Sequence, residues 1–498
     1  MATSNIGKGA IISYVAIFLN IAISFLYTPW MLRQIGASDY GLYSLIISFI
    51  SYFIMDFGLV SAIARFVAKY RAEGNDKKVE NTLGLTLNIF FLIDAVIFLC
   101  LVVCYFFLTD IFTGLTSEEL AKLKVLYVIA GTFSVLTFCL KPLDGALTAY
   151  EYFVSAKLLD MAYKVGSVAL VVVALYLGGN IYHLVLVNGG LSFLTSVYRY
   201  FYWHKKTGLT PNLKFFDRME AKAIFSFSGW TFLVGLAMRF RLNLVPSILG
   251  IYSNSYQITV FSLGLTIEAM LYSLTSALNG LFLPKVSRLV FSEDDQSIMD
   301  LMIRVGRIQL FLITCIITGF LVCGRTFIML WVGEEFSDVY YITLALILPF
   351  TIAVTVQIAM DKIFAEGKVK YTAKAVFVTS IIGLVASCCV ASKYGAVGCG
   401  FCSAVASLFT QLWYLHIFKR KIHIDILTFF KECHAKILPL LSILSVSFYL
   451  FYSYLNIQDW FGMLVAAGIY IVCFVGISWS CLMNQYEKEL VKTLLRIK

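Results

Sequence analysis

The sequence predicts an all-α integral membrane protein of about 14 transmembrane helices, with two six-helix bundles around a central cavity and two extra C-terminal helices. The composition, the apolar runs with their flanking charges, and an internal duplication support this fold class. Of the 498 residues, 60% are hydrophobic and 14% are charged, whereas soluble domains are about half apolar and about a quarter charged. Lipid is therefore expected to be the main solvent, and helices satisfy the backbone there.

Long apolar runs define the predicted spans, since a transmembrane helix needs about 20 mostly apolar residues. The first run has no short apolar core followed by a small-residue cleavage site, so we expect an uncleaved span rather than a signal peptide. The runs of sufficient length are 9–32, 40–64, 82–108, 125–149, 157–178, 181–203, 224–249, 255–283, 306–332, 339–364, 372–393, 396–418, 437–456 and 460–483.

Basic residues sort strongly between the two sides of this arrangement. With the N-terminus inside, roughly 28 Lys and Arg residues fall in inside loops and tails and roughly 4 in outside loops, as the positive-inside rule requires. This predicts a multi-pass membrane protein with both termini cytoplasmic. The net charge of +10 then follows from topology, and we expect no nucleic-acid partner.

The two halves of the chain resemble each other at a nearly constant offset. Because each copy has an even number of spans, both copies would share one orientation, which is the design of a transporter with two lobes. We expect an N-terminal six-helix lobe at 1–222, a C-terminal six-helix lobe at 223–421, and an amphipathic linker with helices 13 and 14 at 422–498. The matching pairs are Gly36 with Gly250, Gly114 with Gly333, Lys157 with Lys374, and Gly178 with Gly395.

Ionisable residues deep in a span are costly, so each is a candidate functional residue. Arg239 and Arg241 lie well inside one predicted span, and Asn243 follows Arg239 by one helical turn. A cationic cavity suits an anionic substrate, and guanidinium matches phosphate oxygens. We therefore predict a headgroup site made of Arg239, Arg241 and Asn243 with Lys141 and Lys164.

Two acidic residues lie near the middle of predicted spans. Asp94 and Glu268 are candidates for carrying a coupling proton or cation. Alternatives remain for the basic residues. Arg239 and Arg241 are two apart and cannot share a helix face, so one could reach the interface or bind Glu268.

Some of the remaining charges have the spacing of neutralising pairs along one helix. Lys141 precedes Asp144 by three residues, and Asp160 precedes Lys164 by four. Such neighbours lie on one helix face and can pair with each other. The pairs are therefore an alternative to a role for either lysine in substrate binding.

The sequence predicts no cofactor, no metal site and no enzymatic activity. Cys399 and Cys402 form a C-x-x-C within an apolar run, but no second pair accompanies them, so we interpret them as small packing residues. No glycine-rich phosphate-binding loop is present. The longest outside loop, about 109–123, is too short to carry the catalytic groups of a membrane polymerase or glycosyltransferase.

Three segments carry a resemblance to a known family. Residues 28–43, 56–59 and 65–70 resemble the first outside loop and the following segment of Wzx-type oligosaccharide flippases, which belong to the multidrug/oligosaccharidyl-lipid/polysaccharide exporter (MOP) superfamily. The resemblance implies a lipid-linked oligosaccharide substrate, an undecaprenyl-pyrophosphate-linked repeat unit flipped across the cytoplasmic membrane for cell-surface polysaccharide assembly. It also implies alternating access driven by an ion gradient or membrane potential.

The resemblance further implies a bacterial cytoplasmic membrane as the location, membrane lipid as a partner, and polysaccharide polymerases and glycosyltransferases as candidate protein partners. The internal repeat makes a monomer a sufficient unit. Two alternatives share the expected fold. A multidrug or cation extruder would need a net acidic cavity, against which the deep arginines argue. A lipid II flippase is compatible with the span count, whereas the motifs within 28–70 favour the oligosaccharide group.

Overall fold

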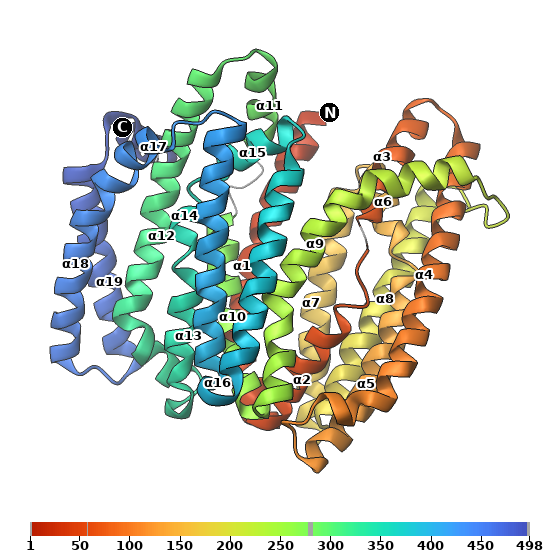
Figure 1. Ribbon diagram of the computed structural model, residues 1–498, viewed down its shortest axis with the longest axis horizontal. Coiled ribbons are helices and arrows are strands. Elements are labelled where there is room, and N and C mark those ends of the chain that lie inside the picture. The colour runs from red at the N-terminus through yellow and green to blue at the C-terminus, as the bar shows by residue number, and fades with distance from the viewer. Residues whose placement is uncertain (1, 57, 277–281, 496–498) are drawn as a thin grey trace. The chain divides into compact units, whose positions relative to one another are not determined.

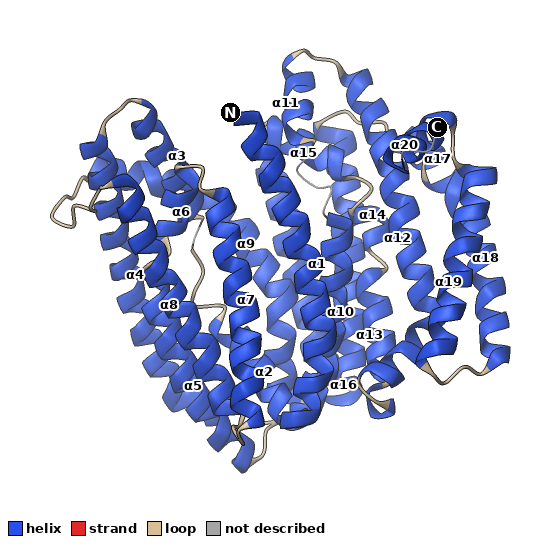
Figure 2. Ribbon diagram, turned by 180° about the vertical axis from the view of Figure 1, so that it is seen from behind, coloured by secondary structure: helices blue, strands red, loops and turns tan. Residues whose placement is uncertain are grey.

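The computed structural model describes residues 2–56, 58–276 and 282–495, and leaves out some helical side chains, chiefly within 2–14, 226–242 and 490–495. All regular structure in these ranges is helical (Figure 2). The predicted fold class is therefore confirmed: an all-α chain built from long apolar helices. Glycines with positive φ, such as Gly178 and Gly208, lie at several helix ends, where the absence of a Cβ permits this backbone.

The helices divide into two compact units. The first comprises Met1–Ser262 and Leu384–Gly395, and the second comprises Leu263–Gly383 and Ala396–Lys498. The chain passes from one to the other within α10 (Ser255–Ser276), and α16 (Val369–Lys421) contributes to both. The helices that lie wholly in the first unit are α1 (Ala2–Ile35), α2 (Ala37–Ile50), α3 (Leu59–Ala72), α4 (Asp76–Ile111), α5 (Ser117–Phe138), α6 (Pro142–Ala149), α7 (Phe153–Tyr176), α8 (Ile181–Thr207) and α9 (Arg218–Tyr252).

The second unit continues the chain from α10 to the C-terminal helix. Its helices are α11 (Leu283–Phe291), α12 (Asp295–Trp331), α13 (Asp338–Ile347), α14 (Phe350–Ala353), α15 (Gln357–Ala365), α17 (Ile426–Glu432), α18 (His434–Leu455), α19 (Trp460–Ile477) and α20 (Gln485–Leu495), with a 3-10 turn at Glu334–Phe336 and a π-helical turn at Ser478–Leu482.

The number of spans agrees with the prediction once the bent helices are considered. Ten described helices are long and apolar enough to cross a membrane, and the bent pair Asp338–Ala353 and Gln357–Ala365 makes an eleventh. Helix α16 is counted once there, although Gly395 (φ 52, ψ −140) divides it into two helices. The remaining predicted spans correspond to the broken pair α2–α3 and to α9.

The prediction of one unbroken span at 40–64 is wrong. Helix α2 ends at Ile50 and α3 begins only at Leu59, after Gly58 in the left-handed conformation at φ 71. Side chains from α9 stabilise this break, because Asn243 Nδ2 donates to Ser51 Oγ at 2.8 Å. Irregular backbone at membrane depth is tolerated where protein groups surround it.

Two further predicted spans are bent rather than straight. The span 125–149 consists of α5 and α6, with Pro142 as the first residue of α6, where a missing N–H costs little. The span 339–364 is divided between Ala353 and Gln357, where its two parts meet at 60°. These bends place polar residues at helix ends inside the apolar part of the fold.

Small residues let helices of the first unit approach closely. Helices α4, α5, α7 and α8 lie side by side (Figure 1). A Cβ added to Gly189 in α8 would lie 2.6 Å from the Phe133 ring of α5, and a Cβ on Gly145 in α6 would lie 2.7 Å from the carbonyl oxygen of Val60 in α3. Close helix contacts in membranes typically depend on such residues.

The second unit ties its C-terminal helix to its longest spanning helix. Arg307 of α12 donates through Nε to Glu487 Oε1 of α20 at 2.5 Å and through Nη2 to Leu482 O at 2.8 Å. Both side chains are buried, so each charge needs the other. Helices α18 and α19 pack on α12 through a buried apolar cluster of Val322, Cys323, Tyr452, Met463 and Ala466.

Candidate functional site

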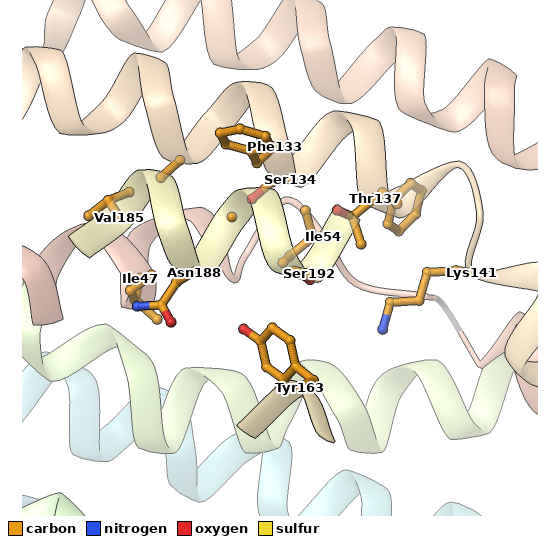
Figure 3. A pocket seen from close by; sticks show the side chains of 13 residues that line it. Ile47, Ile54, Phe133, Ser134, Thr137, Lys141, Tyr163, Val185, Asn188 and Ser192 are labelled. Atoms are coloured by element: carbon orange, nitrogen blue, oxygen red, sulfur yellow. The ribbon is translucent and has the colours of Figure 1, made fainter. Parts of the chain in front are cut away.

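Two adjoining cavities lie within the first unit, between α5, α6, α7 and α8. Their volumes are about 170 and 210 Å³. Both are lined by Thr137, Lys141, Tyr163 and Ser192, so they form one continuous site, which we call the α5–α8 cavity. Figure 3 shows Tyr163 lying across from Phe133, Ser134 and Thr137, with Asn188 and Lys141 on either side of it.

The α5–α8 cavity has an apolar end and a polar end. The smaller part is walled by aliphatic and aromatic side chains, including Ile47, Ile54, Phe133, Phe138 and Val185. The larger part is lined by charged and hydroxyl-bearing side chains, including Asp144, Asp160, Thr195, Ser196 and Arg199. A concave, largely apolar wall with a few converging polar groups is typical of a small-molecule site.

An ion triad closes the polar end. Arg199 of α8 donates from Nη1 to Asp144 Oδ1 of α6 and from Nη2 to Asp160 Oδ1 of α7, the latter at 2.5 Å. The expected neutralising pairs Lys141–Asp144 and Asp160–Lys164 are therefore not formed. The guanidinium can serve two carboxylates with one planar fork, and three helices are joined at this point.

Lys141 and Lys164 have no carboxylate partner among the described residues. Lys141 lies at the start of α6, and its half-buried side chain lines both parts of the α5–α8 cavity. Lys164 is half-buried in α7 next to Tyr163, but it does not line the cavity. An unpaired ammonium in apolar surroundings is costly, so Lys141 is the cavity residue best suited to meet an anion.

Several further polar groups of the cavity make no hydrogen bond to the described part of the chain. They belong to α5, α7 and α8, and those labelled in Figure 3 lie around the same space as Lys141. The Thr137 hydroxyl and Arg199 Nε are buried without a partner. The other unpartnered side chains are Ser134, Tyr163, Asn188 and Ser192. Buried polar groups normally find a partner, so a hydrogen-bonding ligand or water would complete this site.

The predicted residues of the seventh span lie outside this cavity. Arg239 is half-buried in α9, and no carboxylate pairs with it in the described part of the chain. Asn243 is engaged with the end of α2, because its side chain donates to Ser51 and its carbonyl accepts from Tyr52. The side chain of Arg241 lies outside the described residues.

The two predicted coupling residues belong to different units. Asp94 of α4 is 7% exposed, and its Oδ1 has no hydrogen-bond partner among the described residues. Glu268 of α10 is also buried, in the second unit. Of the predicted site residues whose side chains the structure describes, Lys141 is the one that lines the α5–α8 cavity.

Sequence reasoning missed Arg199, Tyr163, Asn188 and Ser192. Arg199 lies inside the predicted span 181–203 and should have been treated as an intramembrane cation. The sequence indicates such a role for Arg199, because Asp144 and Asp160 lie in neighbouring spans and need a positive counter-charge. The other three are ordinary span residues, and only the packing of α7 against α8 makes them neighbours.

A protein-family model described as polysaccharide biosynthesis protein matches residues 6–291. The chain belongs to this family. The match runs from α1 to the end of α11, so it includes the whole α5–α8 cavity. No protein of curated function matches the chain.

Solved structures with the same fold include a lipid II flippase and transporters of the MOP superfamily. The lipid II flippase MurJ in an inward closed conformation matches with TM-score 0.72 and 15% identity, covering 96% of this chain and 100% of that one. An inward-facing multidrug resistance MATE family transporter matches with TM-score 0.66 and 12% identity, covering 82% and 98%. A MOP superfamily transporter from Pyrococcus furiosus, described as having a binding pocket of reverse polarity, matches with TM-score 0.61 and 11% identity, covering 83% and 95%.

These likenesses establish the fold of this polysaccharide biosynthesis protein. The resemblance drawn from residues 28–70 is confirmed at the level of family and fold. The protein is a multi-pass membrane protein, given its ten or more apolar helices.

Proposed function

We propose that this protein flips undecaprenyl-pyrophosphate-linked oligosaccharide repeat units across a bacterial cytoplasmic membrane for cell-surface polysaccharide assembly. The family match supports a role in polysaccharide biosynthesis, and the fold is that of transporters which include a lipid II flippase. Two six-helix lobes, 1–222 and 223–421, alternate access to the two leaflets, and residues 422–498 form an added C-terminal element. A multidrug extruder would share this fold, and so would a lipid II flippase.

The observation that carries the proposal is a set of intramembrane cations without carboxylate partners. Among the described residues, Lys141, Lys164 and Arg239 make no ion pair, and Arg241 and Asn243 complete the proposed headgroup site. Lone cations in a membrane favour an anionic substrate over a cationic drug. A pyrophosphate offers the oxygens that arginine and lysine bind best.

Transport is driven by an ion gradient or by the membrane potential. A carboxyl group that exchanges a proton or a cation can couple such a gradient to the lobes. Asp94 and Glu268 are the buried carboxyls that we assign to this step. The proposed partners are membrane lipid and the polymerases and glycosyltransferases of the same assembly process, and a monomer suffices.

Leaflet translocation tests the proposal directly. Proteoliposomes with a fluorescent undecaprenyl-pyrophosphate oligosaccharide should show transport by the wild type and its loss in Arg239→Ala. Arg33→Ala removes the same charge from an exposed position at the end of α1 and serves as the matched control. Efflux of a cationic dye without movement of the lipid-linked sugar would favour the extruder, and preference for lipid II over the oligosaccharide would favour the lipid II flippase.

A further inference from the structure

The α5–α8 cavity combines features that the proposed headgroup site does not explain. It lies within the first unit, and of the proposed headgroup residues only Lys141 lines it. Its other polar groups belong to uncharged side chains or to the ion triad. The nature of these groups restricts the chemistry of a ligand.

The charges of the cavity disfavour a cationic ligand. Arg199 binds both lining carboxylates, Asp144 and Asp160, and Lys157 Nζ lies 3.9 Å from Asp160 Oδ2. Two cations therefore balance these two carboxylates. Among the described residues that line the cavity, the Lys141 ammonium is left without a counter-ion. Three donors at the polar end have no acceptor in the described part of the chain, namely Lys141 Nζ, the Thr137 hydroxyl and Arg199 Nε. Donors of this kind bind an anionic oxygen strongly.

The middle of the cavity suits a ring that carries hydroxyl groups. Tyr163 lies opposite Phe133 (Figure 3), and amphipathic aromatic side chains contact both apolar faces and polar edges. Asn188, Ser192 and Ser134 surround this space with amide and hydroxyl groups that have no protein partner among the described residues. A pyranose has apolar C–H faces and a rim of hydroxyls, which matches this arrangement of wall and rim.

We infer that the α5–α8 cavity is a binding subsite for one acidic sugar, a pyranose bearing a carboxylate or a phosphate, with its ring at Tyr163 and its anionic group at Lys141. The inference rests on the proposed function only in taking the transported group to be a saccharide. Beyond the proposed function, the inference locates a sugar subsite within the first unit and gives this subsite a preference for a charged sugar. Asn188 and Ser192 position the ring hydroxyls, and the Arg199 triad holds the polar end in shape.

Binding of small glycosides to the purified full-length protein in detergent tests this subsite separately from transport. The probes are methyl glucuronide, glucose 1-phosphate and methyl glucoside, measured by saturation-transfer NMR with competition. We expect the wild type to bind the acidic probes at least about tenfold more tightly than methyl glucoside, the difference expected for a hydrogen bond to a charged group. A preference for the glucuronide or for the phosphate identifies which anionic group the subsite takes.

Two variants distinguish the subsite from nonspecific binding. Lys141→Met should abolish the preference for acidic probes, while Lys124→Met, which removes a charge from α5 outside the cavity, should keep it. Asn188→Leu should weaken all three probes. Equal binding of acidic and neutral probes by the wild type, or a preference that survives Lys141→Met, would overturn the inference. Flipping without any glycoside binding would overturn the subsite and keep the flippase, whereas glycoside binding without flipping would do the reverse.

Discussion

Arg199 is the residue on which the polar end of the α5–α8 cavity depends. Its guanidinium joins α6, α7 and α8 through Asp144 and Asp160, and its side chain is 19% exposed. Replacing Arg199 by Met leaves Asp144 without a cation. Asp160 keeps only the longer contact to Lys157 Nζ, at 3.9 Å. Breaking a buried ion pair costs about 3–5 kcal/mol, and since Asp160 is half exposed we expect Arg199→Met to lower the free energy of unfolding by about 2–3 kcal/mol.

The measurement is unfolding of the purified protein by SDS titration in mixed micelles. The triple variant Arg199→Met, Asp144→Asn, Asp160→Asn removes all three charges and should recover most of the lost stability, because apolar or neutral groups replace a buried ion pair at little cost. A triple variant as unstable as the single one would show that Arg199 acts through packing instead.

The contacts of Arg199 with Asp144 and Asp160 could not be predicted from the sequence. Spacing along one helix suggested Lys141 with Asp144 and Asp160 with Lys164, because only neighbours within a helix are visible in a sequence. Arg199 lies many residues away, yet its planar fork reaches both aspartates at once. Depth in a span identifies Asp94 as an intramembrane carboxyl, whereas Lys141 lies nearer the end of its predicted span and enters the predicted headgroup site through its charge. Neither depth nor charge shows which of these side chains share a cavity.

At the scale of elements, the position of α6 depends on close contact with α3. A Cβ on Gly145 would lie 2.7 Å from Val60 O and 3.0 Å from Ile63 Cβ, and the first of these is backbone that cannot rotate away. Gly145→Ala should therefore push α6 from α3 and lower the free energy of unfolding by about 1–3 kcal/mol, the usual cost of overpacking. Since α6 begins directly after Lys141 and carries Asp144, acidic glycoside binding should weaken as well.

Gly166→Ala in α7 is the matched control for this change. Its added Cβ would meet only Leu191 Cδ2, at 3.4 Å, so the higher helix propensity of Ala should leave stability unchanged or raise it by up to about 1 kcal/mol. Both variants are compared in the same SDS titration. Equal stability of the two variants would rule out a tight contact at Gly145.

The breaks in the helices mark the limit of prediction at this scale. Hydropathy placed the spans well because burial in lipid selects apolar composition over about 20 residues. It could not show that 40–64 breaks after Ile50, since the cause lies partly in Asn243, almost two hundred residues away. The bend before Pro142 had a local signal, because proline disfavours helix at the preceding residue.

At the scale of the whole molecule, the positive-inside rule predicts which ends of the helices face the cytoplasm. The connection between α3 and α4 is flanked by Lys69, Arg71, Lys77 and Lys78, whereas the connection between α4 and α5 at 112–116 has no basic residue. The same contrast recurs along the chain in the ratio of roughly 28 to 4. This bias sets orientation when loops are short.

Reporter fusions test this topology at the two ends of α4. Alkaline phosphatase, which is active only outside the cytoplasm, should be active when fused after Gly114 and inactive after Gly74, and a fluorescent protein fused at the same sites should give the opposite pattern. The α4 helix spans 36 residues, so these two sites must lie on opposite sides of a membrane about 30 Å thick. The reverse pattern would place the basic loops outside the cytoplasm and would contradict the predicted orientation. The polar end of the α5–α8 cavity, at Arg199 near the basic last turn of α8, would then lie toward the outer side of the membrane.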